Sequence, residues 1–141
     1  QGVVHRDVKP ANCLVDDQDR LHLADFGLAA RQEDSAEAKL TNDGAVVGTP
    51  AYMAPEQAAG QRGEAKPAAD QYAVGAVLYE LLTGRPPFEG PAAVVLYNAL
   101  HTEPDRPGKL RPDVPRDLET VCLKAMAKRP EDRYADCGTL A

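Results

Sequence analysis

The order of apolar and polar positions along the chain predicts a small β-hairpin followed by helices. Short apolar runs at 13–15 and 21–24 flank the stretch 16–20, which is rich in turn-forming residues, and this pattern is typical of two strands in a hairpin. From 71 to 82, nine of twelve residues are apolar. A helix that is apolar nearly all round is expected to be buried. The pattern therefore predicts an α+β fold in which helices dominate.

Further helices are predicted after this buried one. The Gly and Pro residues within 83–87 form a helix stop. A second helix is predicted at 91–100 and a third at 115–127, where apolar residues recur at the spacing of one helix face. The last residues, 134–141, begin another element. The stretch 31–48 is polar and aperiodic, and a loop of this length inside a compact domain is usually functional or mobile.

Composition and charge narrow the class of protein. With 141 residues, of which 43% are hydrophobic and 27% charged, the chain has the size and make-up of one globular domain at most. Its net charge of −6 argues against a nucleic-acid partner, which usually requires a basic excess. The longest apolar run, 73–79, is far shorter than a membrane span. Three widely spaced cysteines without a CxxC pair argue against a zinc site or a disulfide framework, and they favour a reducing, cytosolic compartment.

Three short motifs carry the candidate chemistry. The sequence H-R-D-V-K-P-A-N at 5–12 has the form H-R-D-x-x-x-x-N, D-F-G stands at 25–27, and A-P-E stands at 54–56. Each motif alone is a weak signal, but the three in this order and at these spacings are highly specific. They resemble the catalytic loop and the two ends of the activation segment of protein kinases.

The resemblance extends through the whole chain and is to the large lobe of a Ser/Thr protein kinase of the bacterial, receptor-like (Hanks) type. It implies a protein-kinase-like large lobe, mainly helical, with a small β-hairpin at the active site. Residues 1–141 would form a partial kinase domain, from the catalytic loop to the start of the last helix, with an activation segment at about 25–56. The small lobe of the family, with its Gly-rich loop and ATP-binding Lys, has no counterpart in this sequence. We therefore expect an incomplete fragment that is inactive alone, and marginally stable because the helix around Val77 would expose an apolar patch.

The chemistry that the resemblance implies is transfer of the γ-phosphoryl group of ATP, with Mg²⁺, to Ser or Thr hydroxyls of proteins. This reaction requires positioning and charge neutralisation more than covalent catalysis. Asp7 would orient the attacking hydroxyl and accept its proton, and Lys9 would place a positive charge near the transferred phosphate of the nucleotide. Asn12 and Asp25 would supply oxygen ligands for magnesium, a hard cation. Leu14 would pack under the adenine.

The same resemblance gives roles to further positions. Thr49 would be a third catalytic residue, whose hydroxyl bonds Asp7 and Lys9. The structural candidates are His5, which would pack and hydrogen-bond under the site; Phe26; Asp70, whose carboxylate would hold the backbone of the catalytic loop; and Glu56 with Arg133, which would form an ion pair. Most of these residues would build the site without touching substrate.

Regulation is expected in the long loop. Arg6 would meet a phosphorylated residue of the activation segment, and Thr41 is the candidate phosphoacceptor. Phosphate at Thr41 would add roughly −1.5 to −2 charge and could dock on Arg6. Asp43 would give a partial constitutive charge next to this position, or it would form a turn with Gly44; the sequence leaves both open.

Two other functions remain as alternatives. A pseudokinase scaffold is disfavoured because Asp7, Lys9, Asn12 and Asp25 are all present. A small-molecule phosphotransferase is disfavoured by Arg6, by Phe26-Gly27 and by A-P-E at 54–56, because that group lacks the protein-substrate segment. The expected partners are protein substrates with Ser/Thr acceptors, with no nucleic acid and no membrane contact from this segment. The full-length protein could be membrane-anchored or dimeric, with its kinase domain on the cytoplasmic side.

Overall fold

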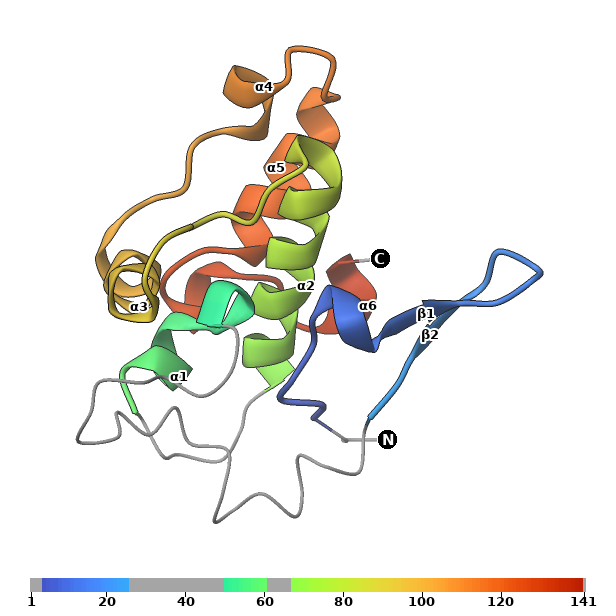
Figure 1. Ribbon diagram of the computed structural model, residues 1–141, viewed down its shortest axis with the longest axis horizontal. Coiled ribbons are helices and arrows are strands. Elements are labelled where there is room, and N and C mark those ends of the chain that lie inside the picture. Colours follow the sequence, from blue (N-terminus) through green and yellow to red (C-terminus); the bar gives the residue numbers. More distant parts are fainter. Residues whose placement is uncertain (1–3, 26–49, 61–66, 141) are drawn as a thin grey trace.

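The computed structural model describes residues 4–25, 50–60 and 67–140. In this part of the chain a β-hairpin stands beside helices that lie around the long helix α2 (Figure 1). The helices are α1 Pro55–Ala58, α2 Pro67–Thr83, α3 Ala92–His101, α4 Pro107–Leu110, α5 Arg116–Ala125 and α6 Cys137–Leu140, with short 3-10 turns η1 Pro10–Asn12, η2 Pro50–Tyr52 and η3 Pro130–Asp132. The predicted α+β class, mainly helical with a small hairpin, is confirmed.

The hairpin has the predicted position. Strand β1, Cys13–Val15, pairs antiparallel with β2, Leu21–Leu23, so that Cys13 lies opposite Leu23. The connection is closed by Asp16, whose carboxylate accepts the backbone N–H groups of Gln18 and Arg20, both at 2.9 Å. This is the local bonding that makes Asp a turn former. The hairpin points away from the helices (Figure 1).

Helix α2 begins before the predicted start at 71. Its first turn carries Pro67, whose fixed φ suits the first helical position, followed by two alanines, which favour helix without adding an apolar periodicity. The end of the helix agrees with the predicted stop. Gly84 adopts φ 81° and its N–H donates to Glu80 O at 2.7 Å, a left-handed cap that glycine adopts without strain.

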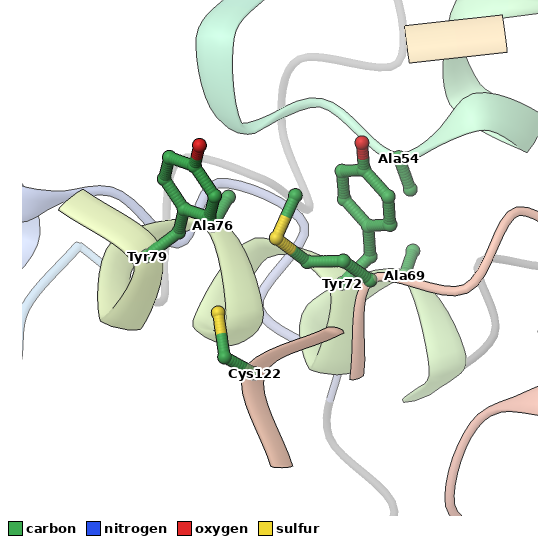
Figure 2. Close-up of a cluster of buried hydrophobic side chains, with 7 residues drawn as sticks. Ala54, Ala69, Tyr72, Ala76, Tyr79 and Cys122 are labelled. Carbon is green, nitrogen blue, oxygen red and sulfur yellow. The ribbon is translucent and has the colours of Figure 1, made fainter. Parts of the chain in front are cut away.

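The main core lies between α2 and α5. Tyr72, Ala76 and Tyr79 of α2 are buried against Cys122 of α5 and against Met126, the residue that follows α5 (Figure 2). Each buried Tyr or Met side chain contributes roughly 1.5–3 kcal/mol by leaving water. The two backbones approach closely at Gly75, where an added Cβ would lie 2.8 Å from Met126 Cγ. The core therefore depends on a glycine in the middle of a helix.

The sequence predictions for the helices are incomplete in two places. Most of helix α2 is buried, as expected, but Val74 is 39% and Leu81 is 76% exposed on one of its sides, where an exposed apolar patch was also expected. A run of apolar residues indicates which side chains favour burial but not which neighbours cover them. The short helix α4 was not predicted, because four residues are too few to show a helical period. In the described part of the chain, no helix combines the length and the apolar character that a membrane span needs.

A second, smaller core holds α3. Phe88, Val95 and Ala99 form it. Beside it, Lys128 Nζ donates to Asn98 O at 3.2 Å and to Ala99 O at 2.8 Å, and lies 4.8 Å from the centre of the Phe88 ring. These carbonyls belong to the last turn of α3, where a cation is favoured. Burial lowers the pKa of Lys128 to about 8, so holding this amine charged has a cost.

Candidate active site

The backbone of residues 5–7 is fixed by one carboxylate from the first turn of α2. Asp70 Oδ2 accepts the N–H of His5 at 2.7 Å, and Asp70 Oδ1 accepts the N–H of Arg6 at 2.8 Å. Arg6 adopts φ 69°, in the left-handed region. This conformation costs a residue with a side chain roughly 1–2 kcal/mol. Hydrogen bonds to a charged acceptor are strong enough to offset this cost, so Asp70 holds the loop in a shape that its own sequence disfavours.

His5 connects this loop to the end of the hairpin. His5 is 2% exposed; its ring Nε2 lies 2.7 Å from Ala24 O, and Nδ1 lies 3.3 Å from the backbone nitrogen of Asp7. A carbonyl oxygen can only accept and a backbone N–H can only donate, so Nε2 carries the proton and Nδ1 accepts. The two bonds select the neutral ring with its proton on Nε2. They also join the backbone of Asp7 to Ala24, the residue before Asp25.

The side chains of Lys9 and Asn12 both meet Asp7. Lys9 Nζ lies 2.7 Å from Asp7 Oδ2. Asn12 Nδ2 donates to Asp7 O at 2.8 Å and to Asp7 Oδ2 at 3.2 Å. Asn12 is buried at 4% exposure, whereas the Asp7 and Lys9 side chains are 57% and 34% exposed. The turn η1 between Lys9 and Asn12 brings both back to Asp7, and one face of the carboxylate is left open to solvent.

Asp25 is positioned by the hairpin. The N–H of Ala24 donates to Asn12 O at 2.8 Å, and Ala24 O accepts from His5, so the backbone just before Asp25 is bonded on both sides. Asp25 itself has φ 65°, and its side chain is exposed. Among the described residues no group of three or more His, Cys, Asp or Glu side chains is placed to hold a metal ion. Of the two predicted magnesium ligands, Asn12 is buried at 4% exposure and Asp25 is exposed.

A segment at 50–60 forms the opposite wall of a hollow beside Asp7. The hollow is lined by Arg6, Asp7, Lys9, Tyr52, Met53 and Gln57, together with residues of α2. Tyr52 Oη donates to Glu80 Oε2 at 2.6 Å, which ties the segment to α2. Burial raises the pKa of Tyr52, and the adjacent Glu80 carboxylate raises it further. The phenol therefore stays protonated and donates this bond throughout the ordinary pH range.

The same segment is anchored a second time by Glu56 and Arg133. Arg133 NH1 and NH2 reach the two carboxylate oxygens of Glu56, each at 2.8 Å. The remaining guanidinium donors bond backbone oxygens: Nε to Ala127 at 2.8 Å, NH1 to Ala68 at 2.7 Å and NH2 to Lys128 at 3.2 Å. The Arg133 side chain is 0% exposed. The expected ion pair is thus present, and it joins α1 to the turns before and after η3.

The structure brings together some of the expected site residues and leaves others undescribed. One region holds most of the expected site residues, namely His5, Arg6, Asp7, Lys9, Asn12, Asp25 and Asp70. The pair of Glu56 and Arg133 anchors the segment 50–60 next to this region. Phe26, Thr41, Asp43 and Thr49 lie outside the described residues. Leu14 is 54% exposed on β1.

Three residues of the region were not singled out in the sequence: Tyr52, Gln57 and Glu80. Glu80 carried a signal, because it is the one acidic residue in the apolar run 71–82. A carboxylate inside a buried helix requires a partner. Gln57 gave no signal, since a glutamine after a short motif fits an ordinary surface helix equally well.

Known proteins resemble this chain closely. The protein kinase domain family matches residues 1–138. A probable serine/threonine-protein kinase of Corynebacterium efficiens is 43% identical over 145 residues, which cover 99% of this chain and 22% of the relative. The serine/threonine-protein kinase PknB of Mycolicibacterium smegmatis is 42% identical, and PknB of Mycobacterium tuberculosis is 43% identical, over 134 residues each; both alignments cover 94% of this chain and 21% of the relative.

These matches extend over nearly the whole chain, although it spans only about a fifth of the length of the curated relatives it matches. The family match includes all three motifs and every described residue that meets at Asp7. The resemblance seen in the motifs is therefore confirmed. The chain belongs to the protein kinase family, among its bacterial Hanks-type serine/threonine kinases.

Proposed function

We propose that this chain supplies the catalytic loop of a kinase that transfers the γ-phosphoryl group of ATP to Ser or Thr hydroxyls of proteins. The observation that carries the proposal is the arrangement around Asp7. Its carboxylate is open to solvent on one side and held by Lys9 and Asn12 on the other, at 2.7 and 3.2 Å. A carboxylate placed in this way can orient a hydroxyl and accept its proton.

The donor set fits magnesium and a phosphate-bearing substrate. The Asn12 amide nitrogen is used by Asp7, which leaves its amide oxygen for a cation, and Asp25 adds an exposed carboxylate. Magnesium is commonly held by one or two such protein oxygens, with phosphate oxygens and water completing its shell. When bound, MgATP supplies the phosphoryl group and neutralises its charge. Lys9 then adds a positive charge near the phosphoryl group, and Leu14 offers an exposed apolar surface on which the adenine of ATP can pack.

The roles of the remaining site residues are proposed for the full-length protein. We propose that Thr49 bonds the catalytic Asp and Lys, that Phe26 is a structural residue of the site, and that Arg6 docks a phosphate carried by Thr41, with Asp43 as a partial substitute. Arg6 is exposed at the rim of the hollow, as such docking requires. We further propose that transfer needs the small lobe of the family, so that residues 1–141 alone are inactive. The kinase domain is proposed to work on the cytoplasmic side, with or without a membrane anchor elsewhere.

The test is transfer of labelled phosphate from ATP by the full-length protein, beside its Asp7→Asn form. Asn keeps the size of the side chain but cannot accept the proton. We expect labelling of the enzyme or of a generic Ser/Thr substrate, and loss of at least about a hundredfold in the variant. Equal labelling by both forms would point to a contaminating kinase. Nucleotide binding without transfer in either form would favour a pseudokinase scaffold and contradict the proposal.

A further inference from the structure

Gln57 has a side chain that bonds in two directions. Its Oε1 accepts the backbone N–H of Ala54 at 3.1 Å, across the first turn of α1. Its Nε2 donates to the carbonyl oxygen of Arg6 at 3.4 Å, across 51 positions of the sequence. The first bond is a local cap of a short helix. The second joins the segment 50–60 to the peptide unit immediately before Asp7.

The peptide units around Arg6 are held from two sides. Asp70 accepts the Arg6 N–H at 2.8 Å, and the Gln57 amide meets the Arg6 carbonyl. Arg6 lies at φ 69°, so the direction of the chain entering Asp7 depends on these outside contacts rather than on local preference. A small rotation of the Arg6–Asp7 peptide would move the Asp7 carboxylate away from Lys9 and Asn12.

The backbone that carries Gln57 is itself well anchored. Tyr52 is bonded to Glu80 at 2.6 Å, and Glu56, the residue before Gln57, is bonded to the fully buried Arg133. Gln57 also lines the same hollow as Asp7 and Lys9. A side chain on a fixed backbone can impose its position on the loop that it contacts.

We propose that Gln57 is a positioning residue for Asp7, and that it couples the arrangement of the segment 50–60 to the orientation of the catalytic carboxylate. The proposal rests on the proposed kinase function. Gln57 acts through the Arg6 carbonyl and does not touch the reacting atoms. An amide is required at this position, because the side chain must accept from Ala54 and donate to Arg6.

Two substitutions separate these two bonds. Gln57→Glu has the same length and still accepts the N–H of Ala54, but a carboxylate cannot donate to the Arg6 carbonyl. Gln57→Met also has a similar length and makes neither bond. If Gln57 only caps α1, Gln57→Glu behaves as wild type and Gln57→Met does not. If Gln57 positions Asp7, both variants are impaired.

The experiment measures kcat and the KM for ATP of both variants in the full-length protein, together with backbone hydrogen exchange. We expect kcat to fall roughly three- to tenfold in both variants, the effect of losing one neutral hydrogen bond, while the KM for ATP stays within about twofold. We expect faster exchange in the catalytic loop for both variants. At Ala54 we expect faster exchange only for Gln57→Met, and we expect Gln57→Glu to unfold at the wild-type midpoint.

Gln18→Glu is the matched control, because it introduces the same charge at an exposed position in the connection of the hairpin, which points away from the helices (Figure 1). This variant should behave as wild type. Wild-type kcat and loop exchange in Gln57→Glu would overturn the proposal, whatever Gln57→Met does. If the wild-type protein itself transfers no phosphate, the proposed function fails, and the exchange measurement still decides whether Gln57 holds the loop.

Discussion

The buried pair of Glu56 and Arg133 offers a quantitative test of how α1 is held beside the loop that carries Asp7. The Arg133 side chain is 0% and the Glu56 side chain 19% exposed, and both hydrogen bonds between them are 2.8 Å long. Replacing one partner of a buried ion pair leaves the other charge without compensation, at a cost of about 3–5 kcal/mol. That is a large share of the roughly 5–15 kcal/mol by which a domain is stable.

The structure predicts that the two ends of the pair differ. In Glu56→Met the guanidinium still donates to three backbone carbonyls, so we expect the lower part of the range, about 3 kcal/mol. In Arg133→Met those carbonyls lose their donor as well, so we expect about 5 kcal/mol. Replacing both residues by Met removes both charges together and should cost less than the sum of the single changes, with a coupling of about 2 kcal/mol or more.

The assay is urea-dependent hydrogen exchange of α1 and of the segment 127–133 in the full-length protein, which reports local opening free energies even when other domains are present. Glu131→Gln provides the control. Its partner Arg129 lies 2.6 Å away, but the Glu131 and Arg129 side chains are 59% and 70% exposed, so we expect no measurable loss of stability. Equal effects of Glu56→Met and Glu131→Gln, or fully additive single changes, would refute the reasoning.

Further predictions concern α2 and α3. Asp70→Ala should lower stability by about 2–4 kcal/mol and expose the amides of the catalytic loop to exchange, because it removes two bonds to a carboxylate; unchanged exchange would contradict this. Gly75→Ala should destabilise by about 1–2 kcal/mol in urea unfolding despite the better helix propensity of Ala, since its Cβ would meet Met126 Cγ at 2.8 Å; a gain in stability would show that the two helices can move apart. Lys128 has a folded-state pKa of about 8 against 10.5 for the free side chain, so the unfolded chain binds more protons between these values and stability should rise with pH across that window. We expect wild type to gain about 2 kcal/mol over Lys128→Met from pH 8 to 10.5, and a flat difference would contradict the burial of this amine.

Local pattern determined several features of this protein from the sequence. Two short apolar runs with turn-forming residues between them located the hairpin, and a nearly continuous apolar run located α2, because these signals depend on neighbours a few positions apart. The three motifs identified the family, and the first of them indicated Asp7, Lys9 and Asn12 as one group of candidate site residues. These residues are close in sequence, and a single tight turn is enough to make them meet.

The tertiary structure alone determined which distant groups contact those residues. Asp70 meets the catalytic loop across 65 positions, Tyr52 meets Glu80 across 28, and Gln57 meets Arg6 across 51. No local preference specifies such contacts; they arise when α2 packs on α5 and places its first turn under the loop. The same packing leaves Val74 and Leu81 exposed on a helix whose composition predicted burial. Propensity and periodicity act over one or two helical turns, whereas the left-handed Arg6 and the open face of Asp7 depend on groups that only the folded chain brings together.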